Sequence, residues 1–297
     1  MSKPAPPFRR GYADTARGQL HYLEAGSGDE TLVLLHATSR SSRCYRRMLP
    51  LLAQRFHVLA PDFPGFGGSH PIDDIGSIED LAQVIVEFLD LRGLQRVHLF
   101  GLHLGNKVGA ALAARWPARV KDLILMGQTH SLIVDRRRRD AEIGRLSRHH
   151  YPPDTASSNG LELLQAWAGV NATIQAQWWT RPLLKNARID ADDVDNARAR
   201  LIDYLTGQPS LEKLYPLVHA FDMTEAYRKV QARTLLIELL TAEEMHLGAQ
   251  APQMAALMQR AEHAALQEAD NMVLEFRPQE VSELILRFLN GSTSGSA

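Results

Sequence analysis

Residues 95–109 constrain the fold more than any other part of this sequence. A short apolar run at 97–100 is followed by a turn in which Gly101 and Gly105 flank His103, and then by a helical pattern. Two glycines around one raised residue permit a sharp strand-to-helix turn in which backbone segments approach each other closely. The sequence therefore predicts a buried strand, a tight turn with His103 at its apex, and a helix.

Strand-like and helix-like patterns alternate along much of the chain. Short unbroken apolar runs are typical of strands that are buried on both faces, and their alternation with helices predicts a parallel sheet. The segment 18–25 alternates as an edge strand does. The clearest helix carries Leu81, Val84, Ile85 and Phe88 on one face. The expected strands are 18–25, 31–35, 56–60, 97–100, 120–126, 234–237 and a weaker one at 263–266.

The alternation stops after the strand at 120–126 and resumes at 234–237. The sequence between them is typical of several helices and loops, so we expect a helical cap inserted into one domain. The expected organisation is an α/β core at 1–130 and 229–290, a helical cap insertion at 131–228, and a flexible Gly/Ser-rich tail at 291–297.

Composition excludes several classes of protein. The 33 Lys and Arg residues nearly balance 34 Asp and Glu, so a net charge of −1 gives no general reason to expect nucleic acid or an anionic membrane as a partner. The single cysteine, Cys44, excludes an intrachain disulfide and fits a reducing compartment. No apolar run is long enough to span a membrane. We expect a cytoplasmic monomer or homodimer.

Metal and nucleotide sites are also not expected. No spacing of histidines and carboxylates matches a strong metal motif. The glycines at 65–68 do not follow a dinucleotide fingerprint, and no lysine follows them as in a phosphate-binding loop. The predicted partner is a small-molecule substrate or ligand, with no metal and no cofactor.

Four motifs, taken in order, resemble the α/β-hydrolase superfamily over residues 18–289. They lie at 34–36, 61–67, 101–105 and 277–281. The resemblance implies an eight-stranded, mostly parallel sheet flanked by helices, with the cap inserted after strand 6. The turn at His103 then corresponds to the nucleophile elbow of that superfamily, where the pattern Gly-x-Ser-x-Gly is expected.

All three catalytic positions implied by the resemblance are changed. His103 stands at the serine position, and Ala242 aligns with the acid, with Glu243 one step away. Asn271 stands where the base histidine is expected, next to Asp270. A serine hydrolase needs a hydroxyl that is activated by an imidazole, which a carboxylate holds. Acyl-enzyme chemistry through a serine at this turn is therefore excluded.

His103 leaves two functional interpretations open. An imidazole titrates near neutral pH, so His103 could act as a general acid or base that Glu243 or Asp270 orients. It could activate water for hydrolysis, or shift a proton in a lyase, isomerase or decarboxylation reaction. The alternative is a catalytically inactive homologue that binds a small apolar ligand or acts as a scaffold, because histidine tolerates the positive φ of such a turn. The chain is also similar, at 221–223, to hydrolase-like sequences with histidine at the elbow.

Other candidate site residues surround the elbow. The main-chain N–H groups of Leu104 and of Ala37 or Thr38 are expected to stabilise a developing oxyanion. Arginines after the strand at 31–35 could bind a substrate carboxylate, and tryptophans in the cap could form an apolar wall or simply pack inside the cap. The candidate substrate-binding residues are Arg40, Arg43, His130, Trp167 and Trp178.

Overall fold

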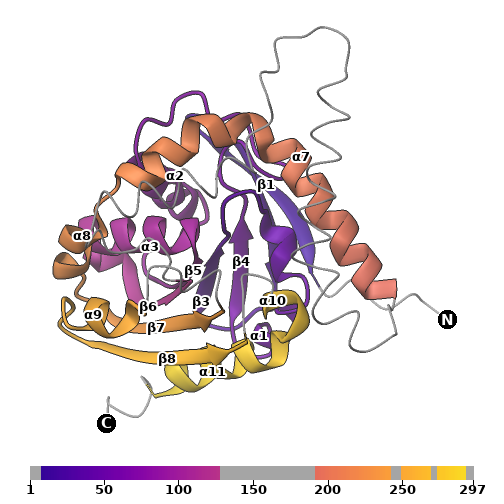
Figure 1. Cartoon of the computed structure of the whole chain (residues 1–297). Helices are drawn as coiled ribbons and strands as arrows, with labels where there is room; N and C mark the ends of the chain where they lie inside the picture. The colour runs from indigo at the N-terminus through magenta and orange to yellow at the C-terminus, as the bar shows by residue number, and fades with distance from the viewer. Residues whose placement is uncertain (1–7, 128–190, 242–248, 269–272, 292–297) are drawn as a thin grey trace, which may run out of the picture. The chain divides into compact units, whose positions relative to one another are not determined.

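A computed structural model describes residues 8–127, 191–241, 249–268 and 273–291 (Figure 1). The chain divides into two compact units, of which one comprises Met1–Leu132 and Gly207–Ala297 and the other Ile133–Thr206. The first unit contains the sheet and is the one described below. Most of the predicted cap insertion at 131–228 lies outside the described residues, so its bounds stay a prediction.

The core of the first unit is one eight-stranded sheet with the order β1-β2-β4-β3-β5-β6-β7-β8. β1 and β2 pair antiparallel, as do β2 and β4, and the remaining pairs are parallel. This confirms the predicted fold class. The strands are β1 (Arg9–Thr15), β2 (Gly18–Ala25), β3 (Thr31–Leu35), β4 (His57–Pro61), β5 (Val97–Leu102), β6 (Val120–Met126), β7 (Arg233–Leu240) and β8 (Ala261–Gln267).

The expectation that 18–25 forms the edge of the sheet is wrong. β2 lies second in the sheet, because β1 pairs with it along its outer side. In β1 only Ala13 is buried, and most of its other side chains are exposed. An exposed edge strand lacks the apolar run by which the other strands were predicted.

Helices cover both faces of the sheet (Figure 1). On one face, α1 (Leu49–Leu52), α10 (Val273–Phe276) and α11 (Pro278–Asn290) join a continuous apolar core that includes Phe100 of β5. On the other face, α3 (Leu104–Arg115) packs on β5 and β6 and contacts α2 (Ile78–Leu91) and α8 (Met223–Lys229). β5 is therefore buried on both sides. The remaining helices are η1 (Ser42–Tyr45), η2 (Pro117–Arg119), α7 (Ala191–Ala220) and α9 (Ala251–Ala255).

Two amphipathic helices of the first unit begin at residues that favour a helix start. α2 follows Ser77, whose side chain accepts a hydrogen bond from the N–H of Asp80 and caps the helix. α11 starts with Pro278, which suits a first helical position because proline has no N–H to satisfy. Among the described residues, no helix has both the length and the apolar character that a membrane span requires.

Candidate functional site

The predicted elbow is present at the carboxyl end of β5. His103 is the single residue between β5 and α3, and its backbone has φ 49° and ψ −99°. Positive φ is uncommon for a residue with a Cβ atom and is strained unless the surroundings hold it. The main-chain N–H of His103 donates to the carbonyl of Met126 at 3.0 Å, so β6 helps to hold the turn. The side chain is half-buried.

Both glycines of the elbow are required by backbone contacts. A Cβ atom on Gly101 would overlap the carbonyl oxygen of Gly105, and a Cβ atom on Gly105 would overlap the carbonyl oxygen of Leu35. Main-chain atoms at these points cannot move aside as a flexible side chain can. The backbones of β5, α3 and the end of β3 therefore lie so close together that a side chain at either glycine would not fit.

The two segments that carry the predicted oxyanion residues meet at this junction. Leu104 is the first residue of α3, so its N–H has no acceptor within the helix and lies at the positive end of the helix dipole. The N–H of Gly105 donates to the carbonyl of His36 at 3.1 Å, which places the start of α3 against the loop that continues with Ala37 and Thr38. Ala37 is buried and Thr38 is half-buried.

His36 has a structural role in that loop. Its ring is fully buried, and its Nε2 accepts a hydrogen bond from the N–H of Phe63 at 2.9 Å. Its Nδ1 lies 2.8 Å from the carbonyl oxygen of Ala37. Because Nε2 accepts, the proton is on Nδ1, which donates to Ala37. The ring thus joins the loops that follow β3 and β4.

Asp62 is a second anchor of the same loops, and its role was not predicted. Its buried carboxylate accepts hydrogen bonds from the N–H of Ser42 at 2.6 Å and of Gly68 at 2.9 Å, and it contacts Nδ1 of His21 at 2.8 Å. Burial acts to raise the pKa of Asp62, but the hydrogen bonds, with that to His21 the largest, hold it below its ordinary value. A charged Asp62 therefore fixes the loop that carries Ala37.

Arg40, a candidate substrate-binding residue, forms an ion pair inside the protein. Its guanidinium is buried and contacts the carboxylate of Glu275 in α10. The main-chain carbonyl of Glu275 also accepts a hydrogen bond from Arg47 at 2.8 Å. The substrate-binding role of Arg40 stays a prediction, and the ion pair shows that the chain itself supplies one carboxylate partner. Arg43 is half-buried in η1.

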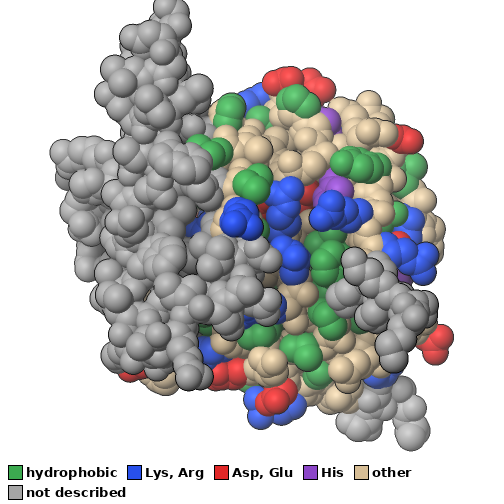
Figure 2. Space-filling model, turned by 90° about the vertical axis from the view of Figure 1, so that its right-hand side faces the viewer, with side chains coloured by type: hydrophobic (Ala, Val, Ile, Leu, Met, Phe, Trp, Pro, Cys, Tyr) green, Lys and Arg blue, Asp and Glu red, His purple; other side chains and the backbone are tan. Residues whose placement is uncertain are grey.

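Surface charge is distributed unevenly over the molecule. Figure 2 shows one face on which Lys and Arg side chains gather near the middle, with hydrophobic side chains beside them. The near-zero net charge of the whole chain therefore does not describe this face.

A cavity of about 330 Å³ in the described unit contains none of the predicted site residues. It is lined by Gly76, Ser77, Ile78, Glu79, Leu217, Ala220, Phe221 and Asp222.

Several predicted site residues lie outside the described part of the chain. They comprise the acid and base positions and the three predicted ligand-binding residues of 128–190. Their roles stay predictions. These residues are His130, Trp167, Trp178, Ala242, Glu243, Asp270 and Asn271. Within the described ranges, no three or more His, Cys, Asp or Glu side chains are grouped as a metal site requires.

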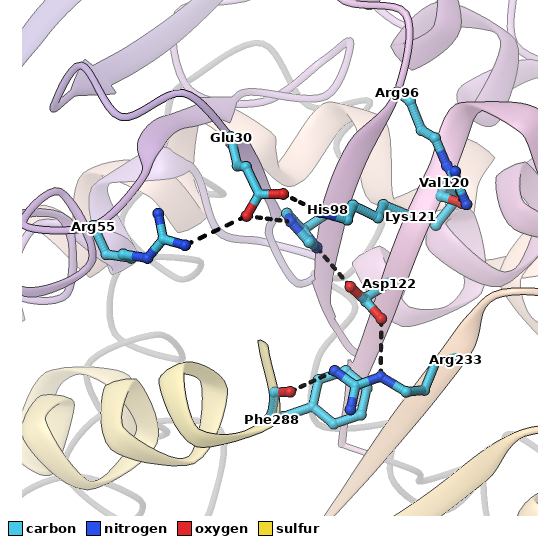
Figure 3. A network of polar contacts seen from close by, with 9 residues as sticks. All are labelled: Glu30, Arg55, Arg96, His98, Val120, Lys121, Asp122, Arg233 and Phe288. Atoms are coloured by element: carbon cyan, nitrogen blue, oxygen red, sulfur yellow. Dashed lines mark hydrogen bonds and ion pairs between the residues drawn. The ribbon is translucent and has the colours of Figure 1, made fainter. Parts of the chain in front are cut away.

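A polar network that was not predicted lies at the amino ends of the parallel strands (Figure 3). His98, at the start of β5, is only 1% exposed; its Nδ1 is 3.0 Å from Oδ2 of Asp122 in β6, and its Nε2 is 3.7 Å from Oε2 of Glu30. Asp122 also accepts a hydrogen bond from Nε of Arg233 in β7 at 3.0 Å. The network therefore joins β5, β6 and β7 with the residue that precedes β3.

A β-bulge and flanking cations complete the network. Val97 pairs with Val120 and Leu99 pairs with Leu123, so two residues of β6, Lys121 and Asp122, lie opposite His98 alone. Such an extra residue redirects the side chains of the bulged strand. Lys121 forms an ion pair with Glu30, and the guanidinium of Arg233 lies 3.9 Å from the ring centroid of Phe288 in α11.

Neighbouring side chains lower the pKa of both carboxyl groups of this network. Burial acts to raise the pKa of Asp122, but its contact with His98 and the hydrogen bond from Arg233 outweigh burial and leave the pKa below the ordinary value. The hydrogen bond from Lys121 is the main cause that lowers the pKa of Glu30. Buried charges of this kind are tolerated only when they are paired. This network is therefore a structural feature of the core.

The chain belongs to the α/β-hydrolase-fold family. The sequence model for the alpha/beta hydrolase fold matches residues 30–199, which is more than half of the chain. Solved structures agree in fold: an enol-lactonase from Burkholderia xenovorans LB400 superposes with a TM-score of 0.73 at 19% identity, covering 94% of this chain and 100% of that one. A hydrolase from Pseudomonas aeruginosa PA01 gives a TM-score of 0.71 at 21% identity, covering 95% and 98%.

Curated relatives match over a shorter part of the chain. A 2-hydroxy-6-oxononadienedioate/2-hydroxy-6-oxononatrienedioate hydrolase from Dechloromonas aromatica is 40% identical over 114 residues, which is 37% of this chain and 39% of the relative. An uncharacterized hydrolase from Saccharomyces cerevisiae is 35% identical over 105 residues, covering 35% of this chain and 36% of the relative. The aligned part thus spans less than half of either relative. These relatives agree with membership of the hydrolase-fold family.

Proposed function

We propose that the protein is a hydrolase-fold enzyme that acts on a small organic molecule through acid/base chemistry of His103, without a serine nucleophile. The observation that carries this proposal is a half-buried imidazole at the strained apex of an elbow that keeps both of its glycines. A turn held at φ 49° by neighbouring strands presents its side chain in a fixed place. An imidazole side chain can serve as a general acid or base in catalysis.

The proposed hydrolytic reaction forms no bond between enzyme and substrate. His103 accepts a proton from water as the water oxygen attacks a substrate carbonyl carbon, and the carbonyl π electrons move onto its oxygen. The N–H groups of Leu104 and of Ala37 or Thr38 stabilise that oxyanion. The protonated imidazole then gives its proton to the leaving atom as the bond to it breaks. The same proton exchange, without water, serves a lyase or isomerase reaction.

The orienting groups and the substrate pocket are part of the same proposal. Glu243 or Asp270 is proposed to orient the imidazole, as a carboxylate orients histidine in other acid/base sites. The names of the curated relatives suggest carbonyl substrates that carry carboxylates. For such a substrate we propose contacts from Arg43, from Arg40, and from His130, Trp167 and Trp178.

The test is a substrate screen followed by one substitution. The purified chain is assayed against p-nitrophenyl esters and against 2-hydroxy-6-oxo-dienoates, with products identified by mass spectrometry. His103→Ala is expected to lower kcat by about 10²- to 10⁴-fold, the range for loss of a general acid or base. His263→Ala, at an exposed histidine of β8, is the matched control and should leave turnover unchanged.

Two outcomes would contradict the proposal. Turnover that survives His103→Ala unchanged would exclude an acid/base role for this residue. A compound that raises the melting temperature of the protein but is recovered chemically unchanged, with no turnover of any substrate tested, would instead support the alternative of an inactive homologue that binds a ligand.

A further inference from the structure

The end of β6 forms a recess against the ring of His103. Gly127 follows β6 with φ 71°, and its N–H donates to the carbonyl of Ile237 in β7 at 3.2 Å. A Cβ atom on Gly127 would lie 2.8 Å from Nε2, 2.9 Å from Cε1 and 3.0 Å from Cδ2 of His103. Carbon atoms do not normally approach ring atoms so closely. Glycine at position 127 therefore leaves room for the Nε2 end of the imidazole in the position that the ring occupies in this structure.

A buried asparagine holds the backbone of this recess. Asn106 lies in the first turn of α3 and is fully buried, and its Nδ2 donates to the carbonyl of Gly127 at 3.2 Å. A buried amide at this place stabilises one position of the peptide that follows Gly127. Asn106 thus connects the elbow helix directly to the floor of the recess under His103.

Helix α8 supports Asn106 from behind. The hydroxyl of Tyr227 donates to Met223 Sδ at 3.3 Å and makes a longer contact, 3.5 Å, with Oδ1 of Asn106. Lys107, the neighbour of Asn106 in α3, donates to the same sulfur at 3.4 Å. Met223 and Tyr227 are fully buried. The segment at 221–223, noted in the sequence, therefore helps to pack α8 against the first turn of the elbow helix.

We infer that Gly127 and Asn106 are positioning residues for His103, and that Met223 and Tyr227 hold Asn106 in place. The inference rests on the proposed function, because it assigns a purpose to the orientation of the imidazole. The elbow thus accommodates an imidazole in two ways. Gly127, after β6, has no Cβ atom to overlap the ring. Asn106 in α3 binds the carbonyl of Gly127 and holds the peptide that follows it.

The first experiment measures the coupling between positions 103 and 127 without any substrate. Gly127→Ala has two steric costs. Alanine must adopt the positive φ of this position, and its Cβ atom overlaps the ring of His103. Gly93→Ala is the matched control, because Gly93 has φ 69° and the Cβ atom that alanine would add there meets no atom within 4 Å. Both variants are made in the natural chain and in His103→Ala, and melting temperatures are recorded by calorimetry.

Gly127→Ala should lower the melting temperature by several degrees more than Gly93→Ala does in the natural chain. In the His103→Ala background the two substitutions should lower it equally, because the ring is gone. Equal effects in the natural chain would overturn the inference, as would an excess effect of Gly127→Ala that persists without the ring. This result does not depend on any activity, so it can fail or succeed separately from the proposed function.

The second experiment uses the substrate found in the screen. Asn106→Asp keeps the shape of the side chain but replaces the amide donor toward the Gly127 carbonyl with a carboxyl group, which on ionisation becomes an acceptor and adds a negative charge. We expect kcat to fall about 10- to 100-fold with little change in KM, and the pH-rate profile to move toward higher pH. Tyr227→Phe, which removes one hydroxyl, should show a smaller fall in kcat with no displacement of the profile.

A purely structural role of Asn106 predicts a different result. If Asn106→Asp only reduced the amount of folded protein, the active fraction would decrease and the pH-rate profile would not move. A decrease in kcat that disappears after correction for the active fraction would therefore overturn the positioning role. If no substrate is turned over by the natural chain, while the coupling between positions 103 and 127 is present, the proposed function fails and the packing between the two residues stands.

Discussion

The two ends of β5 carry histidines in opposite situations. His98 at the amino end is 1% exposed and lies between the carboxylates of Asp122 and Glu30. His103 follows the carboxyl end, is half-buried, and has a strained backbone with φ 49°. The chain therefore surrounds one imidazole with charged partners and places the other at the turn between β5 and α3. One histidine joins strands, and the other is the residue for which we propose acid/base chemistry.

The energetic consequences of the two arrangements differ. Removing one partner of a buried ion pair strongly destabilises the folded protein, because the other charge stays buried without compensation. A strained residue at a functional turn contributes little to stability and can even reduce it. Substitutions at the amino end should therefore affect folding, and substitutions at His103 should affect turnover.

Removing the central carboxylate of the amino-end network should destabilise the protein most. Asp122→Ala leaves His98 and Arg233 without a shared partner, and we expect the free energy of unfolding to fall by about 3–5 kcal/mol. Asp29→Ala, at an exposed aspartate, is the control and should change it by less than about 0.5 kcal/mol. Urea denaturation followed by circular dichroism measures both. If Asp122→Ala lowers the free energy of unfolding by less than about 1 kcal/mol, the network does not stabilise the packing of these strands.

The same network should make stability fall in acid. The pKa of Asp122 and that of Glu30 lie below their ordinary values in the folded chain. Their contribution is therefore complete above the unfolded pKa of about 4 and is lost as pH falls through the folded pKa. For each such carboxyl the slope is at most about 1.4 kcal/mol per pH unit. Between pH 7 and pH 3, the free energy of unfolding should decrease less in Asp122→Asn than in the natural chain. Urea denaturation at each pH measures this difference.

At the other end of β5, replacing the strained histidine should leave stability nearly intact. Glycine accepts positive φ without a steric cost, so His103→Gly should change the free energy of unfolding by no more than about 1 kcal/mol in either direction. Turnover on any substrate found should be lost in the same variant. A strongly destabilised His103→Gly would mean that His103, like His98, serves the fold.

The smallest expected effect concerns a restored serine. His103→Ser places a hydroxyl at the elbow, and the sequence predicts Asn271 where a serine hydrolase has its base histidine, so we expect this hydroxyl not to be activated. Incubation with a fluorophosphonate followed by intact-protein mass spectrometry should give no covalent adduct on residue 103. An adduct that forms as readily as in an ordinary serine hydrolase would show that another group near the elbow acts as the base.

Local sequence patterns predicted most of the sheet and the apex of the elbow. Strands buried on both faces are recognisable as short apolar runs, and Gly101 and Gly105 mark a turn that no other residue permits. β1 was missed because an exposed strand has no such run. The anchoring role of Asp62 was missed because its partners come from β2 and from two separate loops. Nothing near Asp62 in the sequence indicates which donors reach it.

The sequence by itself determined the fold class and the position of His103 at a turn after a buried strand, because short apolar runs and the glycines of a tight turn are local patterns. Only the tertiary structure decided which of two histidines, one within β5 and one directly after it, is enclosed by charges, and that Gly127 leaves space beside the other. These features depend on how neighbouring strands are aligned. A bulge of one residue in β6 brings Asp122 to His98, and spacing along the sequence carries no signal of that alignment.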